Sequence, residues 1–292
     1  MKTAHPRTLD EALEALQRMP DAQLLAGGTD FVVEVNFGHR RPPAVVGLRR
    51  VAELQGWRRD DGELVLGAGL TFTEIENELV EELPALAAAA RTVGSPQMRN
   101  AGTLGGNLGT ASPAGDSLPV LAALDATVVL ARRDGERSLP LAEFVTGVKR
   151  TAIEDGEIIR EVRVPRLPGP QQFLKVGTRN AMVISIACAA VMVDPEGRTV
   201  RCGLGSVAPT PVRAAEAEAF IAGELDWDGP PTDRGTPSGS PGPPRAPAAA
   251  VARFGELAAA ASSPITDHRS TADYRRRAVQ VITARGLQRS LA

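Results

Sequence analysis

Two glycine-rich segments hold the residues whose types and spacing could bind a phosphorylated ligand. The first is the turn Ala26, Gly27, Gly28, Thr29 and Asp30, which follows a short apolar run. Paired glycines let the backbone approach a ligand closely, and successive exposed amides make a nest for an anion. Thr29 adds a hydroxyl donor without adding charge. An ordinary tight turn, with Thr29 or Asp30 capping the following helix, would explain the same residues.

The second segment spans residues 102–116 and is rich in Gly, Thr, Ser and Asn. It offers backbone amides and short hydroxyls but no cation, which suits a diphosphate held by neutral donors. It matches neither the P-loop nor the Gly-x-Gly-x-x-Gly dinucleotide fingerprint. Its one acidic group, Asp116, could accept a hydrogen bond from a ligand or cap a helix that begins near Ser117. Composition alone leaves ligand binding and a purely structural loop both open.

Lysine is scarce in this chain, so each lysine is informative. Lys2, Lys149 and Lys175 are the only lysines among the 33 basic residues. Lys175 is therefore a candidate for a ligand-binding cation, with a surface ion pair as the alternative interpretation.

The composition excludes several classes of function. A net charge of -2, a pI near 6.0 and 3% aromatic residues argue against a chain that wraps or stacks on nucleic acid. No apolar run approaches the roughly 20 residues that span a bilayer, so we expect no membrane span and a cytoplasmic location. Cys188 and Cys202 are too few for an iron–sulfur cluster, which usually needs four thiolates. They lie equally far from Pro195 in the sequence, so they could face each other across a hairpin, as two buried apolar side chains rather than a redox pair.

Together, the two segments resemble the FAD-binding middle (medium) subunits of the molybdenum hydroxylases, of the xanthine dehydrogenase and carbon monoxide dehydrogenase type. The resemblance covers nearly the whole chain and is most specific over residues 97–107, with 110–113 and Asp116. Three further stretches resemble the same family, at residues 157–159 with Pro165, residues 175–179 and residues 271–276.

The resemblance implies that FAD is bound non-covalently, with its diphosphate between the two glycine segments. Asp116 is expected near the ribose, the adenosine or the polar edge of the flavin, Ile159 near the flavin end, and Lys175 near the cofactor. The cofactor-binding residues implied are Ala26, Gly27, Gly28, Thr29, Asp30, Thr103, Leu104, Gly105, Gly106, Asn107, Asp116, Ile159 and Lys175. We expect no catalytic side chain and no metal ligand in this chain, because its chemistry would belong to the cofactor.

The resemblance also implies a role in electron transfer. A molybdenum-cofactor large subunit carrying molybdopterin and an iron–sulfur small subunit carrying [2Fe-2S] clusters would be the partners, and an acceptor such as NAD, oxygen or a quinone would receive the electrons. Met182, Val183 and Ile184 stand where the family often has an aromatic residue over the flavin, which leaves the acceptor open. A free-standing FAD-dependent oxidoreductase and a non-catalytic nucleotide-binding scaffold subunit are the alternatives.

These segments must be positioned by an α+β fold. The resemblance implies a two-subdomain FAD-binding domain of the vanillyl-alcohol-oxidase-like (PCMH) type over residues 1–167, divided into about 1–55 and 56–167. A C-terminal domain like that of carbon monoxide dehydrogenase flavoproteins would follow over residues 168–292, with a small antiparallel sheet and helices. The Pro/Gly-rich segment 229–247 has little to pack and is predicted to be mobile.

Local patterns predict the elements. Capping boxes at Thr8 and Thr71 begin two helices, the second divided by Pro84. The glycine-rich stretch 92–119 is predicted to be a long loop. Further helices are expected over 212–222, over an Ala-rich run and from about Thr271. The last should place Tyr274, Ala278, Val281 and Ile282 on one face. Arg275, Arg276 and Arg277 should form a solvated face or, as the alternative, contact a partner subunit. Strands are predicted at residues 21–26, 44–48, 63–68, 126–131, 136–141, 158–164, 172–176, 184–193 and 199–207.

Overall fold

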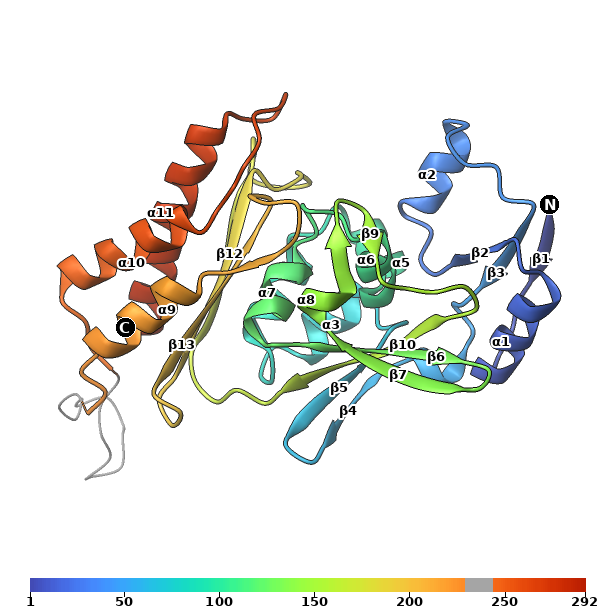
Figure 1. The fold of residues 1–292 in the computed structure, drawn as a ribbon, viewed down its shortest axis with the longest axis horizontal. Coiled ribbons are helices and arrows are strands. Elements are labelled where there is room, and N and C mark those ends of the chain that lie inside the picture. The colour runs from blue at the N-terminus through green and yellow to red at the C-terminus, as the bar shows by residue number, and fades with distance from the viewer. Residues whose placement is uncertain (229–243) are drawn as a thin grey trace.

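The computed structural model describes residues 1–228 and 244–292, and it confirms the α+β class. Figure 1 shows three bodies side by side along the long axis. A small parallel sheet lies at one end, a five-stranded sheet with a group of helices occupies the middle, and a four-stranded sheet backed by helices lies at the other end.

The N-terminal body is a parallel sheet in the order β1-β3-β2. Its strands are β1 (Lys2–Ala4), β2 (Ala22–Leu25) and β3 (Ala44–Gly47), and its helices are α1 (Leu9–Arg18), α2 (Phe31–Asn36) and the 3-10 turn η1 (Ala52–Leu54). Half of the capping box predicted at Thr8 is present, because the Thr8 hydroxyl accepts the Glu11 amide at 3.2 Å, whereas the Glu11 carboxylate accepts from the Arg7 amide instead. Helix α1 buries Leu13 and Leu16 against the sheet, whereas α2 buries no residue.

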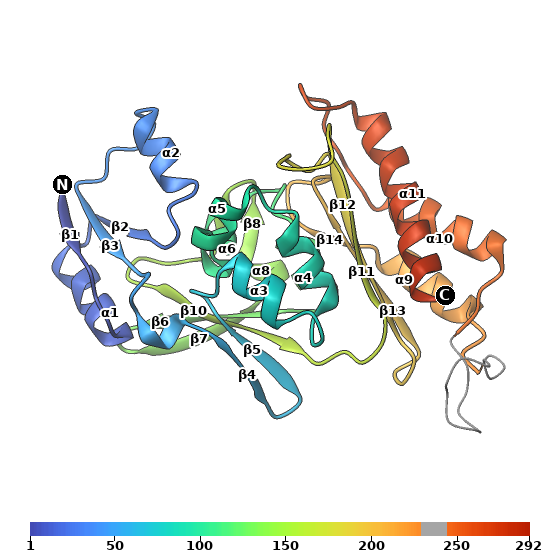
Figure 2. The same ribbon diagram turned by 180° about the vertical axis from the view of Figure 1, so that it is seen from behind.

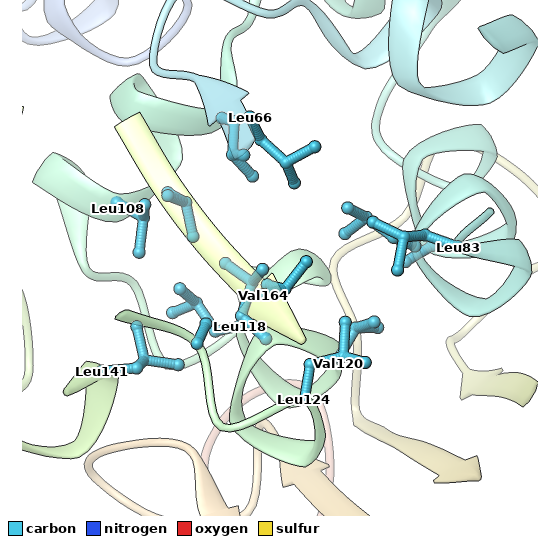
Figure 3. Packing of buried hydrophobic residues seen from close by; sticks show 14 of the residues in the cluster. Leu66, Leu83, Leu108, Leu118, Val120, Leu124, Leu141 and Val164 are labelled. Carbon is cyan, nitrogen blue, oxygen red and sulfur yellow. The ribbon is translucent and has the colours of Figure 1, made fainter. Parts of the chain in front are cut away.

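The central body is an antiparallel sheet in the order β4-β5-β10-β6-β7 with helices packed on one face (Figure 2). The strands are β4 (Trp57–Asp60), β5 (Glu63–Gly67), β6 (Thr127–Arg132), β7 (Gly135–Pro140) and β10 (Ile158–Pro165), with β8 (Val145–Gly147) and β9 (Arg150–Thr151) pairing separately. The helices are α3 (Phe72–Glu78), α4 (Pro84–Arg91), α5 (Pro96–Ala101), α6 (Leu104–Thr110), α7 (Ser117–Ala123) and α8 (Leu141–Phe144). Figure 3 shows Leu66 and Val164 of the sheet among Leu83, Leu108 and Leu118 of the helical layer.

The C-terminal body is an antiparallel sheet in the order β11-β12-β13-β14. It consists of β11 (Gln171–Val176), β12 (Ala187–Asp194), β13 (Thr199–Gly205) and β14 (Val212–Arg213), with α9 (Ala215–Glu224), α10 (Ala248–Ala260) and α11 (Ala272–Ser290) on its outer face (Figure 1). Strand β12 is buried on both faces, since Met192 joins the central core while Val191 joins the C-terminal core. The sheet therefore packs directly on the central helices.

Most predicted elements are confirmed, but several of the predicted bounds and faces are wrong. Pro84 does divide the second predicted helix, because α3 ends at Glu78 and α4 begins at the proline. Residues 92–119 are not one long loop, since they contain α5, α6 and the start of α7. The helix predicted from Val212 begins at Ala215, because Val212 and Arg213 pair with β13 instead.

The predicted faces of two C-terminal elements also need correction. On α11, Tyr274 is exposed and Arg275 is buried, so the three arginines are not one solvated face. In the β12–β13 hairpin, Cys188 pairs with Gly205 and Cys202 pairs with Val191, so the cysteines do not face each other. Both are buried free thiols, as expected, and burial raises the pKa of each.

The prediction of a mobile segment over 229–247 lies largely outside the described residues. The described end of that segment is paired, because Arg245 and Asp226 exchange backbone hydrogen bonds of 2.9 and 3.0 Å. Across residues 1–228 and 244–292, no helix is both long and apolar enough to cross a membrane.

Candidate functional site

A cleft with a volume of about 1090 Å³ opens where the three bodies meet. Ligand pockets usually measure about 300–1,000 Å³, so this cleft has room for a large, extended ligand. All the predicted cofactor-binding residues line it except Leu104, whose side chain is fully buried in the central core. The residues brought together are Ala26, Gly27, Gly28, Thr29, Asp30, Thr103, Gly105, Gly106, Asn107, Asp116, Ile159 and Lys175.

The first glycine segment joins β2 to α2 and presents a row of backbone donors. Gly28 adopts the left-handed region, with φ of 76°, which a glycine takes at little cost. The amides of residues 27–31 donate to no backbone or side-chain acceptor within the described chain, while Val32 already donates to the Gly28 carbonyl at 2.9 Å. Successive unpaired amides at such a turn form the anion nest that the sequence predicts.

The two glycine segments meet backbone to backbone. A Cβ atom on Gly27 would lie 1.9 Å from the carbonyl oxygen of Ala101, so only glycine fits there. A Cβ on Gly106 would lie 3.7 Å from the Cβ of Ala26. A side-chain contact adds to this, because the Thr110 hydroxyl donates to the Asp30 carboxylate at 3.2 Å. The fold thus holds both segments on one wall of the cleft.

The backbone amides of residues 104–107 in the second segment are already used within the protein. Those of Leu104 and Gly105 donate to carbonyls of residues 68–70 at 2.9 and 2.8 Å. The amide of Gly106 donates to the Thr103 hydroxyl at 3.0 Å, which caps α6. Over residues 104–107 the donors left to a ligand are therefore side chains, whereas the amides of Thr103, Ser112 and Asp116 donate to no acceptor within the described chain.

Thr103 and Asn107 supply those side-chain donors. Thr103 accepts the Gly106 amide, and its own hydroxyl proton has no acceptor among residues 1–228 and 244–292. The Asn107 side-chain oxygen accepts the Ser117 hydroxyl at 2.7 Å, which leaves the amide nitrogen for the cleft. Both residues are neutral, as the sequence predicts for this segment, although Arg40, Arg49 and Lys149 also line the cleft.

Asp116 and Lys175 form a buried ion pair where the cleft borders the C-terminal body, a part that we call the C-terminal end of the cleft. Their side chains are 5% and 10% exposed, and Lys175 Nζ lies 2.5 Å from Asp116 Oδ2. Thr92 contacts both partners. Its carbonyl accepts from Lys175 at 3.2 Å, and its hydroxyl lies 3.1 Å from Asp116 Oδ2 and 2.8 Å from the Ala89 carbonyl, between which its one proton is shared. Ser185 donates to the other carboxylate oxygen.

This pair excludes two structural roles that the sequence left open, a helix cap for Asp116 and a surface ion pair for Lys175. Asp116 precedes α7 but makes no side-chain cap. Lys175 does form an ion pair, but a buried one that links β11 to the start of α7 rather than a surface one. An ammonium group has three protons, and Lys175 uses two, so one N–H remains where the side chain lines the cleft.

Several lining residues were not predicted as site residues. Arg269 and the apolar Met182, Val183 and Ile184 come from the C-terminal body, and Lys149 reaches across to Glu34 of α2 at 3.5 Å. The rarity of lysine is the one sequence signal that could have singled out Lys149. In the part of the chain that the structure describes, no group of three or more His, Cys, Asp and Glu side chains could hold a metal ion.

The cleft fits FAD on its own chemistry. The cleft is lined both by neutral donors suited to a diphosphate and by a buried ammonium, and glycine lets backbone line it closely. Comparison with known proteins agrees. Residues 1–167 match the family described as the FAD binding domain in molybdopterin dehydrogenase, and residues 172–228 match the CO dehydrogenase flavoprotein C-terminal domain. The chain belongs to this family, the FAD-carrying subunits of the molybdenum hydroxylases.

Individual relatives support the same assignment. The nicotinate dehydrogenase FAD-subunit of Eubacterium barkeri is 37% identical over 231 residues, which cover 75% of this chain and 78% of that protein. The xanthine dehydrogenase FAD-binding subunit of Escherichia coli O157:H7 is 36% identical over 221 residues, covering 72% and 75%. Among solved structures, reconstituted CO dehydrogenase from Oligotropha carboxidovorans superposes with a TM-score of 0.86 at 26% identity, covering 99% of this chain and 97% of that one.

Proposed function

We propose that this chain is the electron outlet of a three-subunit molybdenum hydroxylase. It would receive electrons from an iron–sulfur small subunit, while a molybdenum-cofactor large subunit oxidises the substrate, and pass them to an acceptor such as NAD, oxygen or a quinone. The observation that carries this proposal is the single cleft in which the unpaired amides of residues 27–31 face the same space as Lys175. The names of the relatives, which include medium chains and FAD subunits, support the assembly.

The residues of the cleft divide the work of holding FAD. The amides of residues 27–31 donate to the diphosphate, with the Thr103 hydroxyl and the Asn107 side-chain amide as further donors. The remaining N–H of Lys175 favours an electron-rich edge of the ligand at the C-terminal end. Ile159 lies beside Gly109 and supplies an apolar contact to the ligand in the cleft.

When bound, FAD supplies the electron transfer itself, which explains why this chain needs no general acid or base of its own. The residues orient the ligand and limit the access of water. Met182, Val183 and Ile184 also line the cleft. They lie in the loop that joins β11, the strand of Lys175, to β12. In this proposal they border the route by which the acceptor reaches the cofactor.

The domain division belongs to the same proposal. Residues 1–167 form the FAD-binding unit, with subdomains of about 1–55 and 56–167, and residues 168–292 form the C-terminal unit. The separate cores of the N-terminal, central and C-terminal bodies support this division. A cytoplasmic location and non-covalent attachment of FAD complete it.

Anaerobic mixing tests the proposal. The isolated chain should show the visible absorbance of a flavin that denaturation releases, and purines, aldehydes or N-heteroaromatic compounds should not bleach it. Bleaching should require the two partner subunits, which co-purification from the native host would identify by metal content. Rapid bleaching by substrate without any partner would instead support a free-standing oxidoreductase, and absence of flavin would support a scaffold subunit.

A further inference from the structure

Arg275 is the largest fully buried side chain among the described residues, and the cleft residues do not include it. It lies in the first turn of α11 and is 2% exposed. Its Nη1 donates to the carbonyls of Ile186 at 2.7 Å and Ser206 at 2.9 Å, and its Nη2 donates to Asp267 Oδ1 at 2.7 Å. One guanidinium thus joins three segments that are far apart in the sequence.

Ile186, the first acceptor, follows a loop whose apolar side chains line the cleft. The amide of Ile186 donates to the Val176 carbonyl at 2.8 Å, which closes the loop formed by residues 177–185. Met182, Val183 and Ile184 of that loop line the cleft. Immediately before Ile186, Ser185 binds the Asp116 carboxylate.

Ser206 and Asp267, the other two acceptors, are hydrogen-bonded to other segments that line the cleft. The amide of Ser206 donates at 2.8 Å to the carbonyl of Pro113, in the segment whose residues 112 and 114–116 line the cleft. Asp267 holds Arg269 through two bonds of 3.0 and 2.7 Å, and Arg269 also lines the cleft. Burial raises the pKa of Asp267, but hydrogen bonds from Arg269 and Arg275 outweigh it and hold that pKa well below its usual range.

Stability alone does not account for this arrangement. A buried guanidinium loses its hydration, and an apolar side chain of similar volume often stabilises a core at least as well. The Nε atom of Arg275 even lacks an acceptor within the described chain. What the planar guanidinium provides, and an apolar side chain cannot, is fixed directions toward several oxygen atoms at once.

We propose that Arg275 is a positioning residue, which sets the loop 177–185, the segment 112–116 and Arg269 relative to one another and so determines how closely the C-terminal end of the cleft encloses bound FAD. The proposal rests on FAD occupying the cleft. The donors proposed for the diphosphate, residues 27–31, belong to the N-terminal body. A change at Arg275 can therefore expose one end of bound FAD without releasing it, and the two effects can be measured separately.

The test uses the full chain with FAD bound and compares Arg275→Met, Arg275→Lys and the control Arg277→Met. Arg277 is exposed on the same helix and donates to Gln280. The readouts are FAD content, the visible spectrum of the flavin and quenching of its fluorescence by iodide. We expect all three variants to retain FAD, but the quenching constant should rise about threefold or more in both Arg275 variants, since local opening exposes the ligand. The control should match the wild type.

Unchanged quenching and an unchanged spectrum in a folded, FAD-loaded Arg275 variant would overturn the proposal. Asp267→Asn decides the question if neither Arg275 variant folds, because it keeps an oxygen for Arg275 while weakening the hold on Arg269. Quenching should then rise about twofold, and wild-type quenching would again refute the positioning role. Lack of FAD in the wild type itself would count against the proposed function instead.

Discussion

Replacing Gly28 by Asp and by Asn isolates the charge recognised by the first glycine segment. The two side chains have nearly the same shape, and both tolerate the left-handed φ of 76° better than other non-glycine residues. A Cβ atom at this position would lie 3.3 Å from side-chain methyl groups of Leu25 and Val32, a crowding that both variants share. The strain is therefore nearly equal, and the variants differ in one negative charge.

The size of the difference follows from Coulomb's law. A carboxylate about 5 Å from one unit of phosphate charge, in surroundings with an effective dielectric constant of about 20, costs about 3 kcal/mol. That energy corresponds to a Kd for FAD roughly 200-fold weaker in Gly28→Asp than in Gly28→Asn. Both should bind more weakly than the wild type, because any side chain at this position crowds the turn.

Fluorescence titration of FAD-free protein with FAD measures the two constants. Equal melting temperatures of the FAD-free variants would show that folding contributes nothing to the difference. The ratio of the two Kd values should decrease at about 1 M salt, where the Debye length falls to about 3 Å and charge repulsion is screened. Equal Kd values for Asp and Asn at low salt would mean that no diphosphate lies against this turn.

Two further outcomes are expected. Thr103→Val and Thr8→Val should each lower the free energy of unfolding by about 1 kcal/mol through loss of a helix cap. Only Thr103 lines the cleft, so only Thr103→Val should weaken FAD binding in the same titration, by about tenfold. Equal FAD affinity in the two variants would show that Thr103 does not bind the cofactor. Hydrogen bonds from Arg137 lower the pKa of Glu157 despite the opposing effect of burial, so this stabilisation is present above its ordinary pKa and is lost as the pH falls through the folded-state pKa. Urea unfolding should therefore show Glu157→Gln less stable than the wild type by about 2 kcal/mol near pH 7, with the difference shrinking toward about pH 3; a difference independent of pH would contradict this.

The elements that were predicted correctly depend on interactions between neighbours in the sequence. The capping box at Thr71 satisfies amides within its own first turn, and Pro84 lacks the amide that a helix interior needs. The hairpin at Gly135 likewise follows from turn chemistry. Such signals lie within a few residues, so a single sequence contains them.

The glycine-rich stretch 92–119 was predicted wrongly because its helices depend on distant contacts. Helices α5 and α6 are short, and neither would be stable alone. Caps from Ser95 and Thr103 start them, and burial of Leu104 and Leu108 against the central sheet holds α6 in place. The same packing explains why Leu104 does not reach the cleft.

In the site, too, features set by local sequence were predicted, and features set by distant contacts were not. Glycine content indicated both segments that line the cleft, but not that the amides of residues 104–107 are already paired. The hairpin of β12 and β13 is centred one to two residues after Pro195, and this small shift separates the cysteines. Among Arg275, Arg276 and Arg277, nothing local indicates which is buried, because the acceptors of Arg275 come from residues 186, 206 and 267.

The ion pair of Lys175 and Asp116 links the two questions of fold and cofactor. The two charges cancel, so the C-terminal end of the cleft presents a dipole rather than a net charge, with one N–H of the ammonium unused. Lys175 belongs to the C-terminal sheet and Asp116 to the central helices. Any movement of one body relative to the other therefore moves that N–H, and the contact between the bodies becomes part of the electrostatics that bound FAD experiences. Removing one partner would leave the other charge buried and unpaired, which costs about 3–5 kcal/mol, so this interface and the cleft are perturbed together.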